Sequence, residues 1–134
     1  MIIGIDPGAV RIGVAIADME TRFARPLEVI DVDAQDPVPR IALLVEEHSA
    51  ERVVVGRPLH LSGETGSAVE NSARLVDALR EELTVPVEEW DERLTTVIAE
   101  QGLRAAGARA KGRRSVRDAV AAQVMLQSYL DANA

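Results

Sequence analysis

The chain has 134 residues, of which 47% are hydrophobic and 28% charged, and its formal net charge is −7 at pH 7. This length suits one domain with a proper core, spanning residues 1–134. The absence of cysteine excludes a disulfide framework and a thiolate zinc site. Without an apolar run of membrane-spanning length or a signal-peptide pattern, we expect a cytoplasmic protein with no membrane partner.

The first part of the sequence predicts three strands in close succession. The run IIGI (2–5) indicates a buried strand, and RIGVAIA (11–17) alternates apolar and small residues after a Pro-Gly turn. PLEVIDV (26–32) fits a third strand. Because too few residues separate these strands for helical crossovers, we expect them to be antiparallel neighbours.

The remainder of the chain alternates helices with strands. In chain order we expect a helix at 38–49, a strand at 53–56, a helix at 65–83, a strand at 85–90 and helices at about 95–106 and 116–131. The apolar stripe of the longest of these helices consists of Val69, Ala73, Val76, Leu79 and Leu83. Right-handed crossovers then build an α/β fold, in which helices cover a mixed sheet.

Acidic residues fall at three places that this topology brings to one edge of the sheet. Asp6 ends the first strand, Asp91 and Glu92 follow the strand at 85–90, and Asp118 lies near the start of the last helix. Ligands of open α/β sheets collect beyond the carboxyl ends of the strands. Converging carboxylates need cations between them, and hard oxygen ligands suit Mg²⁺ or Mn²⁺. Two such ions can activate a water and stabilise the leaving oxygen of a phosphodiester.

Each acid also has a purely structural interpretation. Asp6 before Pro-Gly is a common turn residue. Asp118 follows a serine by three residues, which is close to a capping box. Asp91 or Glu92 could pair with the arginine that follows them. Taken singly, the acids favour these interpretations, but three acids at one predicted edge make a metal site the more economical account.

A basic segment stands out from the acidic remainder. The stretch RAAGARAKGRRSVR (104–117) holds six basic groups and no acidic one, which leaves −13 on the other 120 residues. Such a segment can meet phosphates locally even though the net charge argues against a nucleic-acid partner. Its glycines and alternating Ala and Arg fit a solvated loop equally well.

Four segments together resemble the YqgF/RuvX family: IDPGAVRIGVA, VVVGRPLHLSGETG, DERLT and DAVAAQVMLQSYLD. Members are Holliday-junction-resolvase-like nucleases with the ribonuclease H fold, and they are also implicated in maturing the 5′ end of pre-16S ribosomal RNA. The resemblance runs from residue 2 to about 131. It implies a five-stranded mixed sheet in the order βββαβαβα with helices on both faces, and an endonuclease that uses two metal ions.

The resemblance also implies roles for the acids. Asp6 matches the first-strand aspartate that holds metal in ribonuclease-H-like nucleases, and Asp118 matches the acid at the start of the last helix. Asp91 and Glu92 match the Asp-Glu-Arg motif, and on a continuing strand they would point to opposite faces. We favour Glu92 as the ligand because of its reach and keep Asp91 as a catalytic candidate. The expected metal ligands are Asp6, Glu92 and Asp118.

Substrate contacts are expected from basic residues near this edge and in the basic segment. The glycine-rich loop at 57–66 leads into a helix whose first N–H groups can hold a phosphate, or it is an ordinary connection. The sequence departs from the family pattern at Val10, where Lys or Arg is usual, and at His60, where Asn is usual. Aromatic residues are scarce, so recognition should rest on backbone charge and shape. The expected substrate contacts are Arg11, Arg57, His60, Lys111, Arg113 and Arg114.

Three functions are compatible with the sequence. The first is a two-metal endonuclease on structured nucleic acid, with pre-16S rRNA 5′-end processing ahead of resolution of branched DNA; a four-way substrate would suit a homodimer. The second is a non-catalytic nucleic-acid-binding module of the same fold. The third is a phosphotransferase, because Gly-Ile-Asp-Pro-Gly resembles the phosphate-binding turn of actin-like ATPases and sugar kinases. Those enzymes need two such domains, so we predict the nuclease.

Overall fold

The structure is a computed structural model of the whole chain. It describes residues 1–8, 10–57, 66–91 and 114–133, with the backbone alone at 66–71 and 114–118. Five strands form one sheet: β1 (Ile2–Asp6), β2 (Arg11–Ala17), β3 (Ala24–Asp31), β4 (Arg52–Arg57) and β5 (Val87–Asp91). Their order across the sheet is β3-β2-β1-β4-β5. β1, β2 and β3 are antiparallel neighbours, whereas β4 and β5 run parallel to β1, which confirms the predicted mixed sheet.

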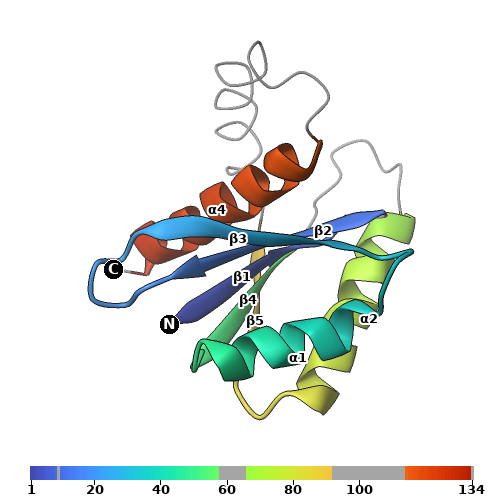
Figure 1. Cartoon of the computed structure of the whole chain (residues 1–134), viewed down its shortest axis with the longest axis horizontal. Coiled ribbons are helices and arrows are strands. Elements are labelled where there is room, and N and C mark those ends of the chain that lie inside the picture. Colours follow the sequence, from blue (N-terminus) through green and yellow to red (C-terminus); the bar gives the residue numbers. More distant parts are fainter. Residues whose placement is uncertain (9, 58–65, 92–113, 134) are drawn as a thin grey trace.

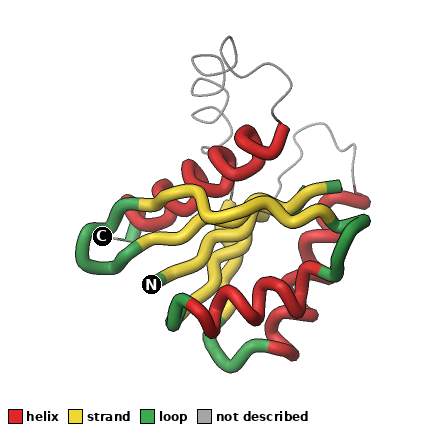
Figure 2. Tube along the Cα trace, viewed as in Figure 1, coloured by secondary structure: helices red, strands yellow, loops and turns green. Residues whose placement is uncertain are grey.

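Helices cover both faces of this sheet, as predicted. α1 (Pro37–Glu47) and α2 (Gly66–Glu82) lie on one face, and α4 (Arg114–Ala132) lies alone among the described helices on the other (Figure 1). The same layers appear in the trace of Figure 2. The helix expected at about 95–106 lies outside the described residues. None of the described helices has the length and apolar character needed to cross a membrane.

Alternation along the strands divides the core into two parts. The strands contribute to the core under α1 and α2 the residues Ile3, Ile5, Ile12, Val14, Ile16, Ile30, Val53, Val55 and Val87. The core under α4 contains Ile2, Ala15, Ala17, Ala24 and Val54, together with Ala122, Met125, Leu126, Tyr129 and Leu130 of the helix. In β1, β4 and β5 the even-numbered residues therefore face α4, and the odd-numbered residues face α1 and α2.

Two predicted features need correction. Among the side chains of α2 that the structure describes, from Ser72 onward, the buried ones are Ser72, Leu75, Val76 and Leu79, whereas Ala73 is exposed. The Ser72 hydroxyl donates a hydrogen bond to the Gly56 carbonyl at 3.4 Å, which turns a polar residue toward the sheet and rotates the stripe away from Ala73. The last helix begins at Arg114 instead of residue 116, so the end of the basic segment is helical.

Candidate active site

Asp6 is the last residue of the central strand β1 and lies between two glycines. Its register partner in β2 is Gly13. On the other side Ile5 pairs with Val55 of β4, so Gly56 lies beside Asp6. The alternation of β1 places Asp6, which is half-buried, on the α4 face. Because both neighbours lack a side chain, the adjacent strands leave space beside this carboxylate.

The course of α4 brings its first turns toward the same edge. The helix runs antiparallel to β1 and ends beside the β2–β3 connection, where the Arg22 guanidinium donates to the Leu130 carbonyl at 2.8 Å (Figure 1). In the middle of the helix, Leu126 lies against Gly4 of β1. Counting from this contact, the Asp118 backbone lies about 12 Å along the helix and Asp6 about 7 Å along the strand. The backbone of Asp118 therefore comes to the edge where Asp6 lies.

The bounds of α4 also bear on the capping interpretation of Asp118. A capping box needs its serine just before the helix and its acid at the third helical position. Because α4 begins at Arg114, Ser115 is already inside the helix and Asp118 is the fifth helical residue. This places Asp118 beyond the first turn, and it removes the helix cap as the reason for an acid there.

Asp91 lies on the other face of the sheet. It is the last residue of β5, it pairs in register with Arg57 of β4, and it is exposed. Within β5, Glu88 accepts a hydrogen bond from Tyr129 of α4 at 2.8 Å, whereas Val87 belongs to the core under α1 and α2. By alternation Asp91 shares the face of Val87, opposite to Asp6. The structure therefore does not bring Asp91 and Asp6 together.

The remaining candidate ligand, Glu92, lies outside the described residues. Among the side chains that the structure describes, no three His, Asp or Glu residues gather closely enough to hold a metal ion. The three expected metal ligands thus remain a prediction. For them the structure supplies the position of the Asp6 side chain and of the Asp118 backbone.

Two of the expected substrate contacts lie at the same end of the sheet. Arg11, half-buried, begins β2 and flanks the turn after Asp6. Arg57 ends β4 on the α2 face, and its Nε lies 4.0 Å from Glu89 Oε2. An exposed pair of this kind contributes little to stability, so Arg57 can exchange its partner for a phosphate. His60, Lys111 and Arg113 lie outside the described residues, and for Arg114 the backbone alone is described.

A pocket beside Asp6 was not predicted from the sequence. It has a volume of about 350 Å³ and opens on the α1 and α2 side of the turn that follows Asp6. Its described lining consists of Pro7, Gly8, Ile12, Val32, Pro37, Arg74 and Leu75. Arg74 is the one charged residue of this lining. Arg74 lies on the exposed side of a long helix, and nothing in the sequence pattern predicted that it would lie close to the turn after Asp6.

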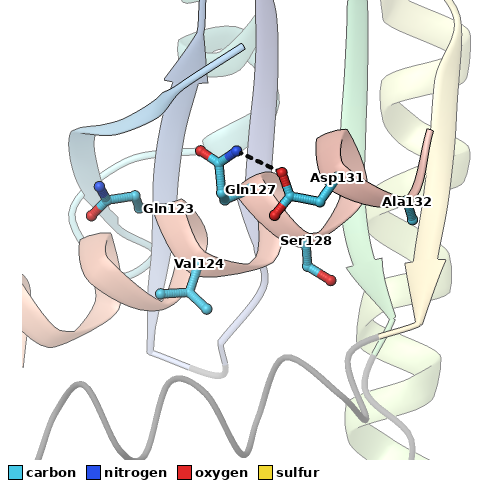
Figure 3. Close-up of a pocket in the computed structure, with 6 residues that line it drawn as sticks. All are labelled: Gln123, Val124, Gln127, Ser128, Asp131 and Ala132. Carbon is cyan, nitrogen blue, oxygen red and sulfur yellow. Dashed lines mark hydrogen bonds between the residues drawn. The ribbon is translucent and has the colours of Figure 1, made fainter. Parts of the chain in front are cut away.

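A larger pocket of about 590 Å³ lies along the second half of α4 (Figure 3). The described residues that line it are Gln123, Val124, Gln127, Ser128, Asp131 and Ala132. Gln127 Nε2 donates to the Asp131 carboxylate at 3.1 Å, as the dashed line marks. Since Asp118 lies near the other end of α4, this pocket is not part of the acidic edge, by which we mean the edge of the sheet where Asp6 and the Asp118 backbone lie.

Known relatives identify the family. The family model described as RuvX, Holliday junction resolvase, matches residues 1–132. The chain belongs to this family. A protein of Chloroflexus aggregans named "Putative pre-16S rRNA nuclease" is 48% identical and covers 98% of this chain and 93% of that protein. A protein of the same name from Geobacillus kaustophilus is 41% identical over 96% of each. Membership of the RuvX family confirms the resemblance found in the sequence and the prediction of a hydrolase of the nuclease class.

Solved structures share the architecture at low sequence identity. RuvC of T. thermophilus in complex with a Holliday junction substrate has a TM-score of 0.57 and 22% identity, and covers 98% of this chain and 94% of that chain. The yeast mitochondrial Holliday junction resolvase Ydc2 has a TM-score of 0.58 and 11% identity, and covers 96% and 77%. These likenesses confirm the ribonuclease-H-like fold predicted for the RuvX chain.

Proposed function

We propose that this RuvX-family protein is a divalent-metal-dependent endonuclease that cleaves structured nucleic acid in the cytoplasm, and that its task is 5′-end processing of pre-16S rRNA. The observation that carries the proposal is the position of Asp6. This carboxylate is half-buried on the α4 face, between two glycines, at the edge to which the Asp118 backbone comes. The names of the relatives support the RNA substrate, and residues 1–134 would form one nuclease domain.

The residues at this edge fit Mg²⁺ or Mn²⁺. Asp6 offers hard oxygen donors, and its register neighbours in β2 and β4 are glycines. We propose that Asp6, Glu92 and Asp118 hold the metal. We favour Glu92 over Asp91 as the metal ligand because Asp91 lies on the face of the sheet opposite to Asp6. When bound, such ions supply an activated water and stabilise the leaving oxygen.

The protein's own residues would bind and orient the substrate. Arg11, which begins β2 beside the turn after Asp6, would contact a phosphate of the strand that reaches the acids. Arg57 can do the same from the other face once it releases Glu89. The basic segment would add further phosphate contacts and offset the repulsion between nucleic acid and the acidic remainder.

Resolution of branched DNA is the second candidate function. The description of the RuvX family and the RuvC structure with a Holliday junction favour it. A homodimer would present two acidic edges to a four-way junction. The two candidates share the same site and differ only in substrate.

Cleavage of matched substrates tests the proposal. A pre-16S rRNA fragment and a DNA four-way junction would be incubated with Mg²⁺, Mn²⁺ or EDTA. We expect metal-dependent cleavage of the RNA, and a loss of more than about 100-fold in Asp6→Asn, as when a group acting directly on transition-state charge is removed. The fold should survive, because repulsion among carboxylates is relieved.

Asp77→Asn is the matched control, since Asp77 is an exposed acid of α2 and lies outside the acidic edge. It should leave cleavage unchanged. Preferential cleavage of the junction would select the second candidate. Binding without cleavage of either substrate in any metal would leave a non-catalytic binding module and overturn the nuclease.

A further inference from the structure

We propose that the pocket bordered by Pro7, Gly8 and Arg74, here called the Arg74 pocket, binds one nucleotide of the substrate strand, and that the Arg74 guanidinium binds its phosphate. This inference rests on the proposed nuclease function and adds to it a substrate contact outside the acids and the basic segment. The Arg74 pocket has a volume of about 350 Å³.

The composition of the Arg74 pocket suits a nucleotide. Its walls are apolar and come from the start of β2, the turn just after β3, the start of α1 and the middle of α2, through Ile12, Val32, Pro37 and Leu75. Ligand pockets of about 300–1,000 Å³ are mostly apolar, with a few polar groups that fix the ligand. Here the apolar walls can receive the faces of a base and sugar, and Arg74 supplies the polar group.

The exposure and charge of Arg74 suit it to bind a phosphate. It is exposed, although its neighbour Leu75 is buried in the core. Within the described part of the chain, no carboxylate forms an ion pair with Arg74. Arg40, by contrast, is paired with Glu28 at 2.6 Å. A guanidinium is always charged and its planar fork matches phosphate oxygens, so Arg74 is suited to an anionic ligand.

The location of the Arg74 pocket points to the substrate strand as its occupant. Asp6 lies on the α4 face at the end of β1, and the pocket lies on the opposite face of the same strand end, with Pro7 and Gly8 between them. A strand whose phosphodiester lies at Asp6 and which continues across this turn therefore reaches Arg74 within a nucleotide or two. In a chain of net charge −7, the Arg74 cation favours a polyanion as the ligand, because other basic residues can hold the same polyanion.

Gly8 lets a nucleic-acid strand pass close to the turn that follows Asp6. A β-carbon built on Gly8 would lie 2.2 Å from the Arg11 carbonyl oxygen, so the turn admits only glycine in this form. The backbone is therefore tightly folded at Gly8, which itself carries no side chain. A nucleic-acid backbone can approach it closely.

Binding measurements in the Asp6→Asn background, where turnover is prevented, test the inference. The probe is a short single-stranded RNA, and its affinity would be measured by fluorescence anisotropy over a range of salt concentrations. Arg74→Gln should weaken binding about tenfold or more, the usual effect of losing a charge-assisted hydrogen bond. It should also lower the slope of log affinity against log salt by about 0.7. Arg74→Lys should restore the slope but only part of the affinity, because an ammonium is a point charge.

Arg25→Gln is the matched control. Arg25 is exposed in β3 and pairs in register with Ile16, far from the turn after Asp6. This variant should bind the RNA with nearly unchanged affinity. Equal effects of Arg25→Gln and Arg74→Gln would mean that only net charge matters, and this would overturn the inference.

Nuclear magnetic resonance locates the contact. A nucleoside 5′-monophosphate should shift the amide signals of Gly8, Ile12 and Leu75, and the unphosphorylated nucleoside or inorganic phosphate should shift them less. These shifts should weaken in Arg74→Gln. Unshifted signals at saturating RNA would overturn the inference. Full shifts with inorganic phosphate alone would also overturn it, because the site would then be a bare anion site.

Failure of this inference is distinguishable from failure of the proposed function. In the chain with intact acids, Arg74→Gln should raise KM while kcat changes little, because Arg74 is not a proposed metal ligand. An unchanged KM together with metal-dependent cleavage would reject the Arg74 contact and keep the nuclease. Nucleotide binding that depends on Arg74 in a chain that cleaves nothing would reject the nuclease and keep the contact.

Discussion

Leu126 of α4 packs directly on Gly4 of β1. A β-carbon added at Gly4 would stand 2.8 Å from Leu126 Cβ and 3.2 Å from its Cγ and Cδ2. The missing side chain therefore lets the helix lie close to the centre of the sheet. Asp6 is two residues beyond Gly4 along the same strand, so this contact also sets how the first turns of α4 are held relative to Asp6.

Adding one methyl group at Gly4 should disturb both stability and activity. In Gly4→Ala the new β-carbon would overlap Leu126, and overpacking of this kind costs about 1–3 kcal/mol. We expect the free energy of unfolding in urea to fall by that amount. The cleavage rate should fall as well at a temperature where the variant is fully folded, because α4 is displaced from β1. If both quantities stayed at wild-type values, the position of α4 would not depend on this contact.

The face on which Asp91 lies predicts different effects of substituting Asp91 and Glu92 on cleavage. Asp91→Asn should retain most of the cleavage activity, because Asp91 lies on the face opposite to Asp6. Glu92→Gln should lose activity about as steeply as Asp6→Asn does. Each change removes one charge without altering shape, so each serves as the control for the other. A steep loss in Asp91→Asn with an active Glu92→Gln would assign the ligand to Asp91.

Most of the fold follows from local sequence patterns. The apolar runs at 2–5 and 53–56 and the alternation at 11–17 mark strands that the structure has within a residue or two. The orientation of α2 was harder to predict from the sequence, because Ser72 faces the sheet through a hydrogen bond with the Gly56 carbonyl. A hydrophobic pattern cannot reveal a polar residue that is buried because of its hydrogen bond. The pattern therefore predicted Ala73, and not Ser72, as a buried residue of the helix.

The acidic edge was predictable only in part. Asp6 was identifiable because a carboxylate ends a buried strand, and adjacent acids such as Asp91 and Glu92 must diverge on any strand. Whether Asp91 shares the face of Asp6 depends on the register of β5, which the sequence does not reveal. The described lining of the Arg74 pocket comes from three separate elements and two turns. No local pattern marks such a place, because its parts meet only in the folded chain.

The salt dependence of binding should report the basic segment. Replacing Lys111, Arg113 and Arg114 by Gln removes three charges, and each lost phosphate contact should lower the log–log salt slope by about 0.7 to 0.9. Affinity should fall across all sequences, whereas the rate at saturating substrate should change little, because none of the three is a proposed metal ligand. Anisotropy titrations at several salt concentrations measure both quantities. An unchanged affinity and slope would mean that the segment is solvated and that phosphates are held near Arg11, Arg57 and His60.

Tyr129 predicts how stability changes at alkaline pH. Its hydroxyl donates to Glu88 Oε2 at 2.8 Å and accepts from the Arg52 guanidinium at 2.8 Å, so it ties α4 to β4 and β5. Burial, and then the hydrogen bond to Glu88, raise the pKa of Tyr129 above its usual 10.0. The folded chain therefore holds this proton more tightly than the unfolded chain does. The resulting stability is complete below pH 10 and is lost as the pH rises from 10 through the raised pKa.

The variant Tyr129→Phe isolates this effect. It keeps the ring, whose centroid lies 5.5 Å from that of Trp90 in an edge-on contact, and it removes the titrating hydroxyl. Because Tyr129 is the single tyrosine of the chain, its absorbance reports its ionisation directly. We expect Tyr129→Phe to lose about 1 kcal/mol at pH 8, the typical net value of a hydrogen bond. Its free energy of unfolding should then decline less than that of the wild type between pH 9 and about 11. Parallel declines in the two proteins would show that another group controls the alkaline transition.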